Sequence, residues 1–150
     1  METRRNLLLA VVLGFSSLLF SSPTWSGHWE ATVNLQKANA MMANSMYQGL
    51  TAFYYSDVYD YTSTGNLYYA WYFADQAKNY AWSAYLDAPS GTLAQTYAYY
   101  AWLYGKNTAT YLYNVYTNPN DNSSILNARD NSRNAQLFIG YGLQACSGRY

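Results

Sequence analysis

Small residues recur along this chain at alternating steps of three and four positions. The series is clearest in two stretches, Ala70, Ala74, Ala77, Ala81 and Ala84, and then Ala94, Ala98, Ala101, Gly105 and Thr108. The same spacing joins Ala38, Met42, Ser45, Gly49, Ala52 and Ser56, and again Ala128, Ser132, Ala135, Ile139, Gly142 and Cys146. Steps of three and four mark the seam between packed helices. Because these side chains are small, the pattern predicts helices that approach more closely than the usual ~8–10 Å.

Turn signals divide this pattern into four segments of helical length. We expect helices over residues 30–59, 67–87, 93–116 and 124–146. The breaks at 62–66, 88–91 and 117–122 are rich in Thr, Ser, Gly, Asn and Pro. Thr92 and Gln95 have the spacing of a capping box at the start of the third helix. The sequence thus predicts an all-α fold, a four-helix bundle or an antiparallel helical-hairpin array, with Ala/Gly/Ser seams flanked by aromatic residues.

One stretch favours a different structure. Residues 108–117 are rich in β-branched and aromatic side chains, which are typical of a strand. A chain rich in Tyr, Asn and Thr could alternatively form β-structure or a cross-β assembly. Alanine is depleted in strands, and the small-residue seams would have no purpose there. The helical interpretation is therefore preferred.

Tyrosine supplies 19 of the 150 residues, and the aromatic positions follow an order. The second and third predicted helices match after a shift of 31 residues, since Tyr68-Tyr69-Ala70-Trp71 corresponds to Tyr99-Tyr100-Ala101-Trp102. One aromatic stripe is Tyr68, Trp71, Trp82 and Tyr85, repeated as Tyr99, Trp102, Tyr113 and Tyr116. A second is Tyr69, Phe73 and Tyr80, repeated as Tyr100, Tyr104 and Tyr111. A true helix repeat and a match caused by composition alone both stay open.

The first 26 residues have the pattern of a secretory signal peptide. Arg4 and Arg5 precede an apolar run over residues 7–20, which is shorter than the ~20 residues that span a bilayer. Thr24 and Ser26 are suitably small if cleavage falls before Gly27. We expect a signal peptide over 1–26, a single small helical domain over 27–150, and a secreted or periplasmic protein with no membrane span after cleavage. An uncleaved N-terminal anchor is the alternative.

Charged residues make up only 11% of the chain, against a usual ~25%. The expected cleavage removes Glu2, Arg4 and Arg5 from a chain of zero formal net charge and leaves a net charge of −1. Nucleic-acid binding needs a concentrated basic face, so this class of function is excluded. Cys146 is the only cysteine, so no disulfide forms within the chain. A buried thiol is preferred over pairing between two chains.

Few side chains offer catalytic or metal chemistry. His28, the only histidine, lies beside the expected cleavage point, where a frayed end is preferred over a ligand or base. We expect no metal site and no cofactor, because zinc sites need several His or Cys ligands. Asp57 and Asp60 are interpreted as a helix end that turns to water rather than as a carboxylate pair. Arg129 and Arg133, one helical turn apart, are interpreted as a solvated face rather than an anion site.

The aromatic side chains are therefore the main candidates for function. Rings at helical spacing mostly pack in a core, but a small bundle cannot bury two stripes on each of two helices together with a seam. An exposed aromatic patch is typical of an interaction site. The residues expected to bind a ligand or partner are Tyr68, Trp71, Trp82, Tyr85, Tyr99, Trp102, Tyr113 and Tyr116.

These observations favour an exported, non-enzymatic protein that acts by association. Its partner would be a second copy of the chain or a component of the cell envelope or extracellular matrix. The alternative is a protein that binds a glycan or a small aromatic ligand in an aromatic cleft, since these rings stack on flat ligands. An enzyme is the least supported class, because no spacing combines an acid, a base and a nucleophile.

Overall fold

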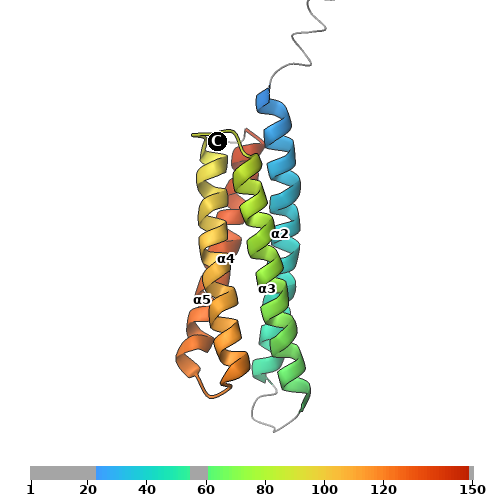
Figure 1. Ribbon diagram of the computed structural model, residues 1–150, viewed down its shortest axis with the longest axis vertical. Helices are drawn as coiled ribbons and strands as arrows, with labels where there is room; N and C mark the ends of the chain where they lie inside the picture. Colours follow the sequence, from blue (N-terminus) through green and yellow to red (C-terminus); the bar gives the residue numbers. More distant parts are fainter. Residues whose placement is uncertain (1–22, 55–60, 149–150) are drawn as a thin grey trace, which may run out of the picture.

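The computed structural model describes residues 23–54 and 61–148, and this part of the chain consists of four helices. Helix α2 spans Pro23–Tyr54, α3 spans Tyr61–Asp87, α4 spans Leu93–Thr117 and α5 spans Asn122–Cys146. These residues contain no strand. The helices lie side by side as a bundle in which each helix runs antiparallel to the next (Figure 1). The predicted all-α fold is confirmed.

The small-residue seams form the interior of this bundle. Every described residue of the four seams is buried except Cys146, which is half-buried. Gly105 shows how closely α4 approaches α3, because a Cβ atom there would lie 3.4 Å from the Cα atom of Lys78. At Gly142 a Cβ atom would lie 2.9 Å from Cδ1 of Leu35 on α2. Side chains larger than those present would therefore push the helices apart.

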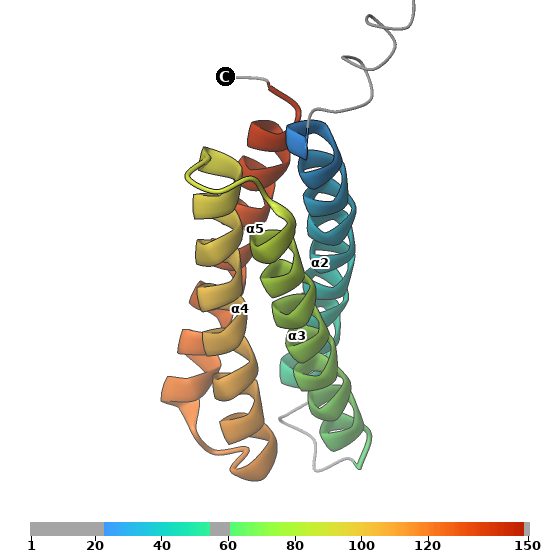
Figure 2. The same ribbon diagram turned by 45° about the horizontal axis from the view of Figure 1, so that its top comes forward.

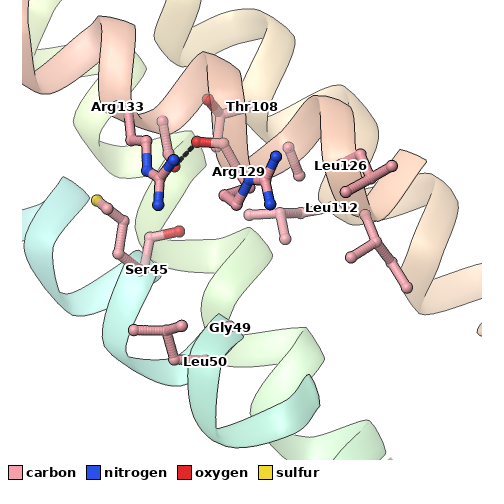
Figure 3. A pocket seen from close by; sticks show the side chains of 12 residues that line it. Ser45, Gly49, Leu50, Thr108, Leu112, Leu126, Arg129 and Arg133 are labelled. Atoms are coloured by element: carbon pink, nitrogen blue, oxygen red, sulfur yellow. Dashed lines mark hydrogen bonds between the residues drawn. The ribbon is translucent and has the colours of Figure 1, made fainter. Parts of the chain in front are cut away.

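Neighbouring helices are not equally close. Helices α2 and α3, α3 and α4, and α4 and α5 pack against each other extensively, whereas α2 and α5 share a smaller contact. Helices α2 and α5 lie together in the upper half of the bundle, where α2 begins and α5 ends, and they diverge toward the lower end (Figures 1 and 2). The pocket drawn in Figure 3 lies between their lower halves.

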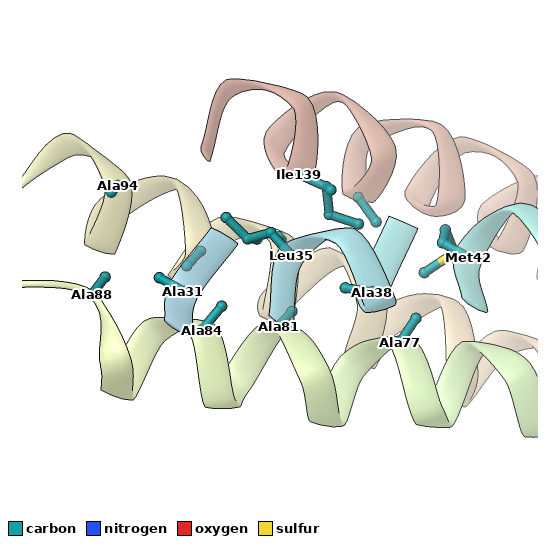
Figure 4. Close-up of a cluster of buried hydrophobic side chains, with 13 residues drawn as sticks. Ala31, Leu35, Ala38, Met42, Ala77, Ala81, Ala84, Ala88, Ala94 and Ile139 are labelled. Atoms are coloured by element: carbon teal, nitrogen blue, oxygen red, sulfur yellow. The ribbon is translucent and has the colours of Figure 1, made fainter. Parts of the chain in front are cut away.

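The largest core cluster fills the upper half, where α2 and α5 are close. Leu35, Met42 and Ile139 are its largest fully buried side chains. They occupy the space between α2 and α5 and face the alanines of α3 (Figure 4). Burial of one such side chain contributes about 1.5–3 kcal/mol. Asn34 Nδ2 also donates a hydrogen bond of 2.7 Å to Asp87 Oδ2, which joins the upper part of α2 to the end of α3.

Side chains in the two described connections start α4 and α5. Thr92 Oγ1 accepts a hydrogen bond from the backbone N–H of Gln95 at 3.2 Å, as the predicted capping box requires. The second bond of the box differs from the prediction, because Gln95 Oε1 accepts from the backbone N–H of Gly91 rather than from that of Thr92. Gly91 has a φ of 76°, which favours glycine. Asp121 caps α5 by accepting from the backbone N–H of Ser124 at 3.1 Å.

The predicted break at residues 62–66 is wrong, because α3 begins at Tyr61 and continues through them. A glycine lowers the stability of a helix by about 1 kcal/mol, and threonine and serine lower it by less. The packing of one adjacent turn is enough to offset these losses. Leu67 provides that packing, since it is buried against Ala52 and Val115. Helix α2 also begins earlier than predicted, at Pro23, while its expected end at 55–59 lies outside the described residues.

The stretch with strand propensity is helical. Residues 108–117 form the last turns of α4, so the alternative of a strand there is wrong. Thr108, Leu112 and Val115 are buried at helical spacing, and this packing outweighs the local preference. Thr108 Oγ1 also donates to the carbonyl of Tyr104 at 2.9 Å, a bond that only a helix places within reach.

Candidate functional site

All eight aromatic residues predicted to bind a ligand or partner lie on α3 and α4, where they form two clusters. In the lower cluster the rings of Tyr68 and Tyr116 have centroids 6.0 Å apart, and those of Trp71 and Tyr113 are 5.7 Å apart. In the upper cluster the corresponding distances are 4.9 Å for Trp82 and Trp102 and 5.8 Å for Tyr85 and Tyr99. We call these eight residues the aromatic face.

The spacing of the residues explains how they pair. On each helix the four residues are separated by three, eleven and three positions. Eleven residues make about three helical turns, so all four lie on one side of their helix. The series three, eleven, three reads the same from either end of a helix. Because α3 and α4 are antiparallel, each contacting pair lies equally far in sequence from Thr92.

Half of the aromatic face is open to solvent. Tyr68, Trp82, Tyr99 and Tyr113 keep 38–49% of their surface exposed. Their four partners, Trp71, Tyr85, Trp102 and Tyr116, are half-buried between the two helices. The half-buried rings thus support the exposed ones from below, which holds the exposed rings in place on the surface.

Charged side chains separate the two clusters. Asp75 and Lys78 form an ion pair on α3, and both remain partly exposed. Lys106 on α4 places its Nζ atom 5.5 Å from the ring centroid of Trp102, a cation–π contact. The face therefore consists of two apolar clusters with a polar strip between them.

Three members of the second predicted stripe contact the neighbouring helices, while Tyr69 of the same stripe is 52% exposed. Tyr100 and Tyr104 stack on Phe138 of α5, with centroids 5.0 Å and 5.4 Å apart. Tyr80 lies under Lys37 of α2, whose Nζ atom is 5.5 Å from the ring centroid. These rings join the α3–α4 pair to α2 and α5. Phe138 was not predictable from the aromatic pattern, because this phenylalanine on the fourth helix belongs to neither stripe.

A pocket of about 310 Å³ lies on another part of the bundle (Figure 3). Helix α2 contributes Ser45, Met46, Gly49 and Leu50, α4 contributes Thr108 and Leu112, and α5 contributes Ile125, Leu126, Ala128, Arg129, Ser132 and Arg133. None of the eight residues of the aromatic face lines it. Arg129 and Arg133 are both exposed, in keeping with the predicted solvated face, and both also line this pocket. Their spacing of one turn was the available signal.

The other candidates take different positions. His28 is not at a frayed end, because it lies in the first turns of α2, half-buried, with its Nδ1 atom buried and without a hydrogen-bond partner. Asp57 and Asp60 lie outside the described residues. Cys146 is half-buried, and burial raises the pKa of its thiol. Within residues 23–54 and 61–148, no three His, Cys, Asp or Glu side chains are close enough together to hold a metal ion.

The same part of the chain contains no helix long and apolar enough to cross a membrane. Comparison of the chain with protein-family models, with curated proteins and with solved structures finds no match.

Proposed function

We propose that this protein is a non-enzymatic association protein that binds a second copy of itself through the aromatic face. The single observation that carries the proposal is the set of four ring pairs on α3 and α4, each with one exposed and one half-buried ring. Tyrosine and tryptophan are enriched at protein interfaces because they add contact area at a low cost in side-chain entropy. Rings held by neighbours lose even less freedom on binding.

The symmetry of the face favours a second copy as the partner. In a symmetric dimer the same patch of both subunits meets itself, so the patch must be complementary to its own rotated image. The aromatic face has two similar clusters on either side of a polar strip, and a rotation of half a turn exchanges them. Each cluster of one copy would then meet a cluster of the other. The ion pair of Asp75 and Lys78 would lie near the centre of the interface.

Sedimentation equilibrium over a range of protein concentrations tests this proposal. We expect a monomer–dimer equilibrium that shifts toward monomer in the double variant Trp82→Ser, Tyr113→Ser. The matched control is Trp29→Ser, Tyr47→Ser, which removes rings that are 70% and 67% exposed but lie on α2. A wild-type protein that stays monomeric at the highest concentration, or a control that weakens the dimer equally, contradicts the proposal.

A second candidate function is binding of a glycan or small aromatic ligand on the same rings. The exposed ring of Trp82, which is stacked on Tyr85 at 4.9 Å, supports it, because a second flat molecule can extend that stack. Titration of tryptophan fluorescence with a panel of soluble glycans tests this alternative. A change in emission that disappears in Trp82→Ser and persists in Trp29→Ser would favour it over self-association.

We also propose that the protein is exported and acts outside the cytoplasm, in the periplasm or the extracellular space. The support is the signal-peptide pattern of residues 1–26, of which 1–22 lie outside the described residues. Cleavage before Gly27 would retain the residue at which α2 touches the end of α3, since a Cβ atom at Gly27 would lie 2.6 Å from the carbonyl oxygen of Asp87. Sequencing the N-terminus of the protein purified from its host tests this, with Gly27 expected first.

A further inference from the structure

The pocket between α2, α4 and α5 exists because small side chains face each other where two helices diverge. In the upper half of the bundle Leu35 and Ile139 fill the space between α2 and α5. In the lower half Gly49 of α2 and Ala128 of α5 leave it open. The resulting volume of about 310 Å³ is at the lower end of the ~300–1,000 Å³ that is usual for small-molecule sites.

The interior of this pocket offers almost no free hydrogen-bond donor. Its three hydroxyl groups all donate to backbone carbonyls: Ser45 Oγ to Ala70 at 2.6 Å, Thr108 Oγ1 to Tyr104 at 2.9 Å, and Ser132 Oγ to Arg129 at 2.7 Å. Apart from the two arginines, the remaining residues that line the pocket are Leu, Ile, Met, Ala and Gly. A hydrogen-bond acceptor placed inside, such as a carboxylate or carbonyl oxygen, would lose its hydrogen bonds to water without replacement, so the interior favours an apolar group.

The mouth of the pocket is positively charged. Arg129 and Arg133 lie one turn apart on α5, and their side chains extend from α5 into the space toward α2 (Figure 3). Like charges at this spacing on a helix repel each other. Arg129 contacts Asp130 at 3.0 Å, but this pair is half-exposed. Arg133 forms no ion pair with any residue of the described part of the chain.

We infer that this pocket binds a small single-chain amphiphile that carries one carboxylate. Its apolar chain would lie against Leu112 and Ala128, and its carboxylate would contact Arg133, with Arg129 as the second cation. The guanidinium group matches a carboxylate well, because its fork of N–H donors forms two parallel hydrogen bonds. The volume limits the chain to a short or medium length. Cationic and uncharged amphiphiles of the same length would lack the contact at the mouth. This inference is independent of the aromatic face.

Isothermal titration calorimetry of the purified protein with decanoate, below the concentration at which it forms micelles, tests the inference. We expect saturable binding of decanoate that is much tighter than that of decanol or decyltrimethylammonium. Arg133→Gln should weaken decanoate binding about tenfold, since a charge-assisted hydrogen bond is lost. The matched control Lys37→Gln removes the same charge from α2 outside the pocket and should leave affinity unchanged.

Two further variants separate the headgroup from the chain. Asp130→Asn frees Arg129 from its partner and should strengthen binding. Leu126→Asp puts a negative charge at the rim of the pocket and should abolish binding of decanoate; the Leu126 side chain is 52% exposed, so the fold tolerates the change. The control is Leu137→Asp, because Leu137 is 47% exposed on the same helix but lies outside the pocket. Absence of decanoate binding, equal affinity for decyltrimethylammonium, or equal effects of Arg133→Gln and Lys37→Gln would overturn the inference.

Discussion

The indole rings of Trp82 on α3 and Trp102 on α4 contact each other with centroids 4.9 Å apart and planes inclined by 48°. Trp82 is exposed and Trp102 is half-buried beneath it. Trp102 also lies 5.5 Å from Tyr99, and Trp82 lies 4.9 Å from Tyr85. This pair therefore joins the two helices at the centre of the upper aromatic cluster, and it belongs both to the packing of the hairpin and to its surface.

The first prediction concerns the strength of this contact. A double-mutant cycle with Trp82→Ala and Trp102→Ala should give a coupling free energy of about 0.5–1.5 kcal/mol, the value typical of an aromatic pair. Urea unfolding followed by circular dichroism measures the four free energies. The control cycle combines Trp29→Ala with Trp102→Ala, two residues without a contact, and should be additive. Equal coupling in both cycles would show that the indole contact itself contributes nothing.

The second prediction concerns the alanine seam. Ala98 is fully buried on α4, so Ala98→Leu forces extra volume between close helices and should lower the free energy of unfolding by about 1–3 kcal/mol. Ala43→Leu makes the same change at an exposed position of α2 and should alter stability by less than about 0.5 kcal/mol. Chemical denaturation of both variants is the measurement. A seam that accepts leucine at Ala98 without loss would contradict the close approach of the helices.

The third prediction concerns acid stability at the start of α5. Hydrogen bonds from the side chains of Ser124 and Ser123 and from the backbone of Ser124 lower the pKa of Asp121 below 3.8. Because the pKa is lower in the folded protein, the stabilisation is complete above the unfolded-state value and is lost as pH falls through the folded-state value. Asparagine is an equally good N-cap without a charge.

Asp121→Asn should therefore lose less thermal stability than wild type between neutral pH and strong acid. Melting curves recorded by circular dichroism across this range give the comparison. Asp130→Asn serves as the control, since it removes another exposed carboxylate of α5 away from the cap. If wild type and Asp121→Asn lose melting temperature in parallel, Asp121 does not contribute through its charge.

The helices were predictable because the seam positions repeat over many turns. Alanines at steps of three and four mark one side of a helix, and this is true for any packing partner. The buried positions could therefore be predicted from the spacing alone. The ends of the helices were harder to predict than their buried positions. Residues 62–66 have the composition of a loop, but the contacts of Leu67 hold them in α3. Local composition carries no information about a contact that comes from Val115, far along the chain.

The residues of the aromatic face could be predicted from the sequence, whereas the existence of the pocket could not. The members share a spacing, which the sequence contains, although their pairing depends on the antiparallel register of α3 and α4. The pocket depends on where α2 and α5 diverge, and hence on which side chains of two distant segments face each other. Ser45 and Ser132 are ordinary seam residues in the sequence, and only the fold places them around a common space.

Hydroxyl-radical footprinting at two protein concentrations is the most direct test of the central claim that the aromatic face is the interface. At the concentration where dimers predominate, Trp82 and Tyr113 should become protected relative to the dilute monomer. Trp29 and Tyr47, which are more exposed and lie on α2, should react equally at both concentrations. Protection of Trp29 and Tyr47 instead, or an unchanged reactivity of Trp82 and Tyr113 in the dimer, would contradict the account.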